Sequence, residues 1–210
     1  MRRYLFLLFL PLFAAAQNPR FMEALQKNKS ILDTAHSLEA FQNVGNTMER
    51  IAGVERKEWL ASYYAAFAHT LQGFYTKENQ MKDDLYDKAM LEANRADSLS
   101  PNNSEIYTLK GMIYQMQLQV SPMTRGQKLG PQATVMFDKA IELDPNNPRP
   151  YYLKGQGLFY TPPIFGGGKD KALPVLQQAV DKYSAFKPSI PVMPDWGANR
   201  ARQLLEECKK

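Results

Sequence analysis

Apolar residues recur at helical spacing over much of the chain. In the ranges 19–35 and 38–52 they are separated by three or four positions, as between Phe21 and Leu25. This spacing puts the apolar side chains on one face of a helix, and that face must pack against another element to leave water. The pattern therefore predicts an N-terminal helix pair within residues 17–54.

A second signal is an internal repeat. Residues 99–111 and 143–155 are identical at more than half of their positions, and each copy runs from a Pro-Asn-Asn turn to a Tyr and a Gly. An alanine also lies twelve positions before the proline of each copy: Ala89 before Pro101, and Ala133 before Pro145. Alanine and glycine at such positions let neighbouring antiparallel helices approach closely, so the repeat predicts stacked helix pairs.

This register resembles the tetratricopeptide repeat, whose period is about 34 residues, over residues 55–184. The segments 46–52, 58–66, 147–153 and 165–169 resemble more narrowly a group of small exported bacterial proteins with that fold and no assigned biochemical role. The resemblance implies an all-α, right-handed superhelical solenoid of antiparallel helix pairs. It supplies no reaction and no functional residues.

The repeat divides the chain beyond residue 54 into two parts. Residues 55–186 hold three helix pairs, with enlarged loops expected near 120–131 and 161–169 because the spacing there exceeds the repeat. Residues 187–210 begin with a proline-rich linker that cannot be helical, and Asp195 is a candidate N-cap for a C-terminal capping helix. Loops longer than packing requires are frequent places for function.

The first residues indicate export. Arg2 and Arg3 precede an apolar stretch that ends at Phe13, and small residues follow before Gln17. We interpret residues 1–16 as a cleaved signal peptide, because the apolar run is shorter than the roughly 20 residues of a membrane-spanning helix. A lipoprotein needs Cys at the position of Gln17, so we expect a periplasmic or secreted protein without a membrane insertion.

Composition narrows the chemistry further. Removal of Arg2 and Arg3 lowers the formal net charge from +5 to +3, and the remaining basic residues form no stripe that would follow a phosphate backbone. We therefore expect no nucleic-acid partner. His36 and His69 lack neighbouring ligands for zinc, and Cys208 is the only cysteine. We expect no metal, no cofactor and no catalytic site.

Glycines in the second long loop allow two interpretations. Gly166, Gly167, Gly168 and Lys169 resemble part of a phosphate-binding loop, but the remaining positions of that motif do not fit. The favoured interpretation is a tight turn into the next helix with Phe165 packed beneath it. An anion at the N-terminus of that helix is the alternative.

The superfamily's geometry selects candidate binding residues on a concave face. The first helix of each pair lines that face, and the positions that point toward it carry polar, aromatic and methionine side chains, which suit a peptide. The selected residues are Tyr64, Thr108, Met112, Met116, Arg149, Tyr152, Gln156 and Tyr160.

Two functions remain open from the sequence. The favoured hypothesis is a non-catalytic exported interaction module that binds a peptide or protein segment on the concave face. The alternative is a soluble small-ligand-binding component, associated with a transporter, with its pocket under the 161–169 loop. An enzyme is a third class, for which the sequence offers no recognisable set of catalytic residues.

Overall fold

The chain folds into helices alone over residues 18–210, the range that the computed structural model describes. The predicted signal peptide, residues 1–16, lies outside this range. Within it there are nine α-helices, one short 3-10 helix and no strand. The α-helices are α1 (Pro19–Thr34), α2 (Leu38–Val54), α3 (Trp59–Tyr75), α4 (Asn79–Leu99), α5 (Ser104–Val120), α6 (Pro122–Leu143), α7 (Pro148–Tyr160), α8 (Lys169–Ala185) and α9 (Ala198–Cys208), with the 3-10 helix η1 (Pro163–Phe165) between α7 and α8.

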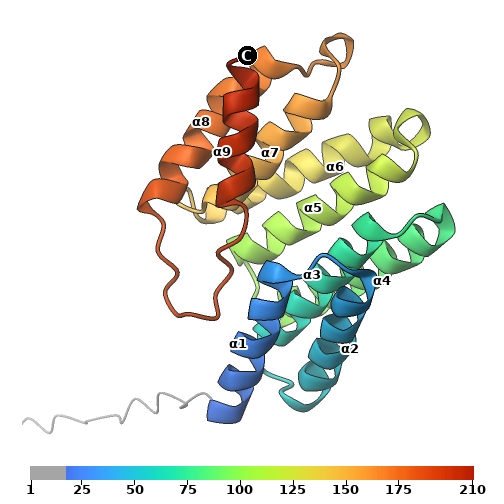
Figure 1. Cartoon of the computed structure of the whole chain (residues 1–210), viewed down its shortest axis with the longest axis vertical. Helices are drawn as coiled ribbons and strands as arrows, with labels where there is room; N and C mark the ends of the chain where they lie inside the picture. Colours follow the sequence, from blue (N-terminus) through green and yellow to red (C-terminus); the bar gives the residue numbers. More distant parts are fainter. Residues whose placement is uncertain (1–17) are drawn as a thin grey trace, which may run out of the picture.

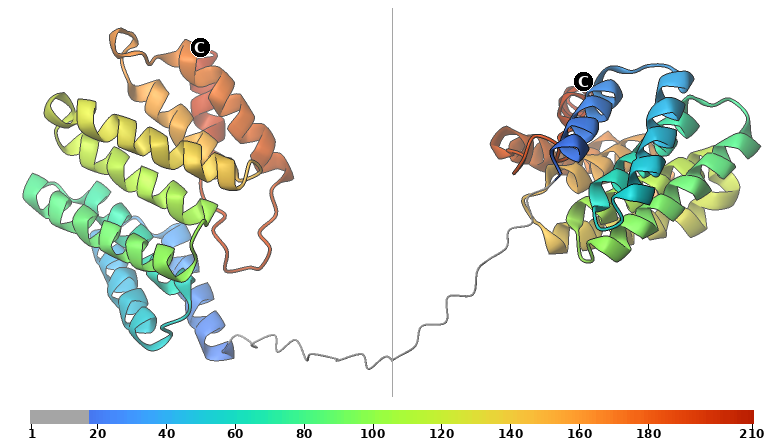
Figure 2. Two further views of the ribbon diagram at one scale, coloured as in Figure 1. Left: turned by 180° about the vertical axis from the view of Figure 1, so that it is seen from behind. Right: turned by 90° about the horizontal axis from the view of Figure 1, so that it is seen from below.

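Neighbouring helices pack in chain order, so the molecule is a row of helix pairs (Figure 1). The odd-numbered helices α1, α3, α5, α7 and α9 also contact one another in sequence, which places them on a common side of the row. The even-numbered helices lie on the other side of the row, as both views in Figure 2 show. No helix within residues 18–210 has the length and apolar character needed to cross a bilayer.

The repeated Pro-Asn-Asn turns start two of the helices in the same way. The side chain of Asn103 accepts a hydrogen bond from the backbone N–H of Glu105, and Asn147 accepts one from Arg149. Each asparagine thus satisfies one of the amide groups that the first turn of a helix leaves without a partner. The internal repeat found in the sequence is therefore a repeated helix start.

Glycines let the two helices of a pair come into direct contact. A Cβ at Gly111 on α5 would overlap the ring of Phe137 on α6, and a Cβ at Gly155 on α7 would overlap Leu176 on α8. Ala133 of α6 and Ala172 of α8, on the second helices of these pairs, are 3% and 0% exposed. The close approach inferred from the repeat is present in both pairs.

We expect Gly111→Ala to lower the free energy of unfolding by about 1–3 kcal/mol, because the added methyl group overlaps the Phe137 ring and the fully packed pair has no space for it. Gly126→Ala in α6 is the matched control, since no atom lies within 4 Å of the added Cβ. The control should raise stability by up to about 1 kcal/mol through higher helix propensity. Urea unfolding of both variants checks the difference, and equal effects would contradict it.

The loop expected at residues 120–131 is helical, which corrects the prediction. Only Ser121 separates α5 from α6, and the extra residues lengthen α6 at its N-terminus. Pro122 occupies the first turn, where the missing N–H costs nothing, and Pro131 lies inside the helix. Arg125 fixes this added length, because its guanidinium donates to both carboxylate oxygens of Asp83 on α4 at 2.5 and 2.7 Å.

The proline-rich linker is ordered and lies along the side of the odd-numbered helices. We call residues 187–197 the strap; Figure 1 shows it as the long loop that leaves α8 and returns to α9. Asp195 does not cap α9 as predicted, because its carboxylate forms an ion pair with Lys29 of α1 at 2.7 Å. Gly197, at φ 103°, stands at the start of α9 instead.

Two clusters of buried apolar side chains form the core. One spans α1 to α5 and the other spans α6 to α9. Trp196 of the strap and Met112 of α5 contact both clusters. The strap therefore joins the two halves of the core, although it has no regular secondary structure.

Candidate functional site

The eight residues predicted for the concave face divide into a buried group and an accessible group. The buried residues, each at most 7% exposed, are Tyr64, Thr108, Met116, Arg149 and Tyr152. Met112 and Gln156 are half-buried, and Tyr160 is 58% exposed. The expectation of an open face is thus corrected for the buried five, because their own chain packs over them.

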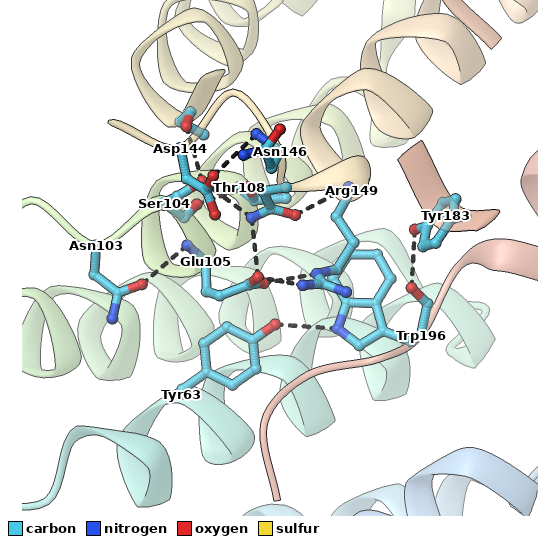
Figure 3. A network of polar contacts seen from close by, with 12 residues as sticks. Tyr63, Asn103, Ser104, Glu105, Thr108, Asp144, Asn146, Arg149, Tyr183 and Trp196 are labelled. Atoms are coloured by element: carbon cyan, nitrogen blue, oxygen red, sulfur yellow. Dashed lines mark hydrogen bonds and ion pairs between the residues drawn. The ribbon is translucent and has the colours of Figure 1, made fainter. Parts of the chain in front are cut away.

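Arg149 is the centre of a buried polar network between α5 and α7 (Figure 3). Its Nε donates to Glu105 at 2.7 Å, and its Nη2 donates to the other oxygen of the same carboxylate. Asn147 donates to Glu105 at 2.9 Å and to the Ser104 hydroxyl at 3.0 Å. Ser104 in turn donates to the carbonyl of Ala140 at 2.8 Å. The network joins the starts of both helices to the end of α6.

For both Glu105 and Arg149, burial and ion pairing shift the pKa in opposite directions. Burial raises the pKa of the Glu105 carboxyl, and the Arg149 guanidinium and the Asn147 amide oppose that rise. Burial lowers the pKa of Arg149, but the attraction of Glu105 and its hydrogen bonds outweigh this and raise the pKa above its ordinary value. Arg149 therefore remains cationic inside the fold.

The C-terminal end of α7 presents the accessible part of the predicted face. Gln156 donates to the hydroxyl of Tyr152 at 3.2 Å, and Arg200 of α9 donates from its Nη2 to the hydroxyl of Tyr160. Burial raises the pKa of Tyr152 to about 12. The helix α9 therefore places a guanidinium beside the exposed aromatic ring of Tyr160.

The glycine loop is a tight turn, but Phe165 does not pack beneath it. Gly166 and Gly168 adopt φ 84° and 104°, a region that favours glycine, and Gly167 lies directly against the last turn of α7. Phe165 is 64% exposed, because the backbone of Gly167 fills the space beneath the loop. Lys169, at the first position of α8, is exposed. The loop therefore presents its apolar side chains outward.

Exposed apolar side chains gather where the helices of a pair meet. The turns α3–α4, α5–α6 and α7–α8 lie along one edge of the molecule in Figures 1 and 2. Most large apolar residues that are exposed within residues 18–210 belong to these turns or the adjoining helix ends. We call this set the tip surface: Phe74, Tyr75, Met81, Met123, Tyr160, Ile164 and Phe165.

The tip surface combines rings and flexible thioethers with high exposure. Met123 and Ile164 are 86% and 85% exposed, and Phe74 is 57% exposed. Side chains of this kind normally contact other apolar groups, so their number along one edge makes this edge a candidate place for a ligand or a partner. Methionine also adapts its shape to different ligands.

The helical repeats and the tip surface define an all-α helical-repeat protein with exposed apolar side chains along one edge. The structure is similar to that of the HusA haemophore from Porphyromonas gingivalis, with a TM-score of 0.83 and 36% sequence identity over 92% of this chain and 94% of that chain. The chain belongs to the family of this haemophore. Neither a protein-family profile nor a curated protein sequence matches the chain.

The sequence pointed to Tyr160, to the α7–α8 loop and to the segment 120–131 that holds Met123, but not to the α3–α4 part of the tip surface. Phe74, Tyr75 and Met81 lie at helix ends, where periodicity no longer distinguishes buried from exposed positions. An apolar residue next to a turn was the available signal. The role of the strap was also missed, because its proline content predicts only the absence of a helix.

Proposed function

We propose that this protein binds haem or a related porphyrin at the tip surface and carries it without transforming it. The observation that carries the proposal is the 36% identity to the HusA haemophore over nearly the whole of both chains. A haemophore is by definition a haem carrier. The proposal favours small-ligand binding, the alternative from the sequence, over a peptide as the principal ligand.

The chemistry of the tip surface supports a porphyrin as the ligand. A porphyrin has two broad apolar faces and, in haem, two carboxylates at one edge. Phe74, Ile164 and Phe165 offer exposed apolar contacts for the faces. Arg200, which donates to the Tyr160 hydroxyl and pairs with Glu207 at 3.2 Å, offers a guanidinium near the α7 end of the surface that a ligand carboxylate can also contact.

The proposal also retains the other sequence predictions that concern the class of protein. It describes an exported, non-catalytic protein whose helix pairs form a tetratricopeptide-like superhelix. The pairwise packing of consecutive helices and the common side of the odd-numbered helices support the superhelix. The resemblance to a haemophore supports an exported location.

We expect Ile164→Ser/Phe165→Ser to weaken porphyrin binding by at least about tenfold, because each apolar side chain that the ligand covers contributes about 1.5–3 kcal/mol. Titration of the full chain with haem, followed by absorbance, measures the effect. A parallel titration with iron-free protoporphyrin IX separates contact with the ring from coordination of the iron. Since the tip surface offers mainly apolar contacts, both ligands should bind and both should lose affinity.

The matched control is Leu91→Ser/Val135→Ser. These two residues are 67% and 58% exposed, but they lie in the middle of α4 and α6, away from the turns. The control removes a similar amount of exposed apolar surface and should leave the affinity unchanged. Equal losses in both double variants would place the site elsewhere, and a wild-type chain that binds neither porphyrin would refute the function.

A further inference from the structure

The strap occupies the side of the odd-numbered helices in the manner of a bound peptide. It has no regular secondary structure and turns at residues 190–193, where the N–H of Met193 donates to the carbonyl of Ile190 at 3.0 Å, and Val192 in this turn is 2% exposed against α3 and its neighbours. The hydroxyl of Tyr64 donates to the carbonyl of Val192 at 2.6 Å, and the hydroxyl of Tyr183 donates to the carbonyl of Trp196 at 2.9 Å. Side chains of the helices thus bind backbone carbonyls of a segment without regular secondary structure, as in peptide complexes.

Side chains of the strap add an aromatic and an ionic anchor. The ring of Trp196 stacks on Phe67 with centroids 5.0 Å apart, and its Nε1 donates to the hydroxyl of Tyr63 at 3.0 Å. The carboxylate of Asp195 pairs with Lys29, whose side chain is only 6% exposed. An acidic residue followed by an aromatic residue therefore pairs with Lys29 and stacks on Phe67.

One buried donor beneath the strap has no partner within residues 18–210. Arg149 is fully buried, and its Nη1 makes no hydrogen bond, although Nε and Nη2 bind Glu105. The guanidinium lies 4.5 Å from the ring centre of Phe186 and 5.9 Å from that of Trp196, so aromatic carbon covers it where an acceptor would fit. An unpaired buried donor is unfavourable, and an occupant with a further carboxylate there would be preferred.

We infer that this face is a recognition surface for an acidic, non-helical segment of a partner protein, and that the strap is an intramolecular competitor for it. The partner segment carries an acid for Lys29, an aromatic ring for Phe67 and a second carboxylate for Arg149. A covalently attached competitor acts at an effective concentration on the order of millimolar, so the partner must exceed the strap in affinity. The added carboxylate supplies that advantage.

A synthetic peptide with the sequence of residues 187–196 tests the inference. Its free C-terminal carboxylate follows the Trp, so it lies near Arg149 if the peptide binds as the strap does. The matched control is the same peptide with a C-terminal amide. Fluorescence anisotropy measures the binding of both labelled peptides to the full wild-type chain and to the full-length variant Trp196→Ala, whose strap has lost its aromatic anchor.

We expect the carboxylate peptide to bind Trp196→Ala at least about tenfold more tightly than it binds the wild type, because the competing strap is weakened. It should also bind at least about tenfold more tightly than the amide peptide, because only the carboxylate satisfies the Arg149 donor. If circular dichroism shows that Trp196→Ala is unfolded, Asp195→Asn, which removes only the ion pair with Lys29, replaces it.

Equal affinities of the two peptides, or no binding to a folded strap variant, would overturn the inference and leave the strap as a structural element. Displacement of the peptide by stoichiometric porphyrin would assign the face to the small ligand instead. The peptide experiment contains no porphyrin until this last step. Its result is therefore separate from the proposed function.

Discussion

Arg149→Met is expected to lower the free energy of unfolding by about 3–5 kcal/mol, because it leaves the buried carboxylate of Glu105 without its ion-pair partner. Glu105 is 7% exposed, and its other side-chain partner is the Asn147 amide, so water cannot replace the lost guanidinium. The pair also joins the starts of α5 and α7. Urea unfolding of the full chain measures the loss.

Two further variants test the cause of this loss. The double variant Arg149→Met/Glu105→Leu should recover most of the stability, because apolar residues of similar volume can replace a buried ion pair at little cost. Lys154→Met breaks the exposed pair with Asp138, whose side chains are 34% and 55% exposed, and should cost less than about 1 kcal/mol. A double variant as unstable as Arg149→Met alone would contradict the electrostatic explanation.

Trp196→Ala is expected to lower the free energy of unfolding by about 3 kcal/mol. This lies at the low end of the range for truncation of a buried Trp, because the Trp196 ring is only half-buried. The variant removes the stack on Phe67, the hydrogen bond to Tyr63 and the contact between the two core clusters. Hydrogen exchange should then rise first in the strap. The measurements are urea unfolding and hydrogen exchange with mass spectrometry.

Trp196→Phe is the control, since it retains a six-membered aromatic ring for the stack and loses the indole N–H and part of the ring area. It should lower the free energy of unfolding by about 1–2 kcal/mol, less than Trp196→Ala, for one lost hydrogen bond and a smaller loss of packing. If Trp196→Ala leaves exchange in the strap unchanged, Trp196 does not hold the strap in place. The peptide experiment would then need the Asp195→Asn variant.

The prediction of close helix contacts agrees with the structure, because Gly111 and Gly155 lie where a side chain would overlap the paired helix. These contacts follow from interactions between residues in fixed register. The N-cap predicted at Asp195 is wrong, because its carboxylate pairs with Lys29 of α1. The α6 start was mispredicted, because Arg125 binds Asp83, a residue 42 positions away.

The sequence by itself determined that residues 18–210 form helices packed in pairs, since helical periodicity and small residues at contact positions act locally. Only the tertiary structure decided which of the predicted site residues are exposed. Tyr64 and Arg149 are on the predicted face, but the strap covers them through contacts between residues more than 100 positions apart in the case of Tyr64 and Val192. Exposure depends on what the rest of the chain covers, so it cannot be read from the spacing of residues within one helix.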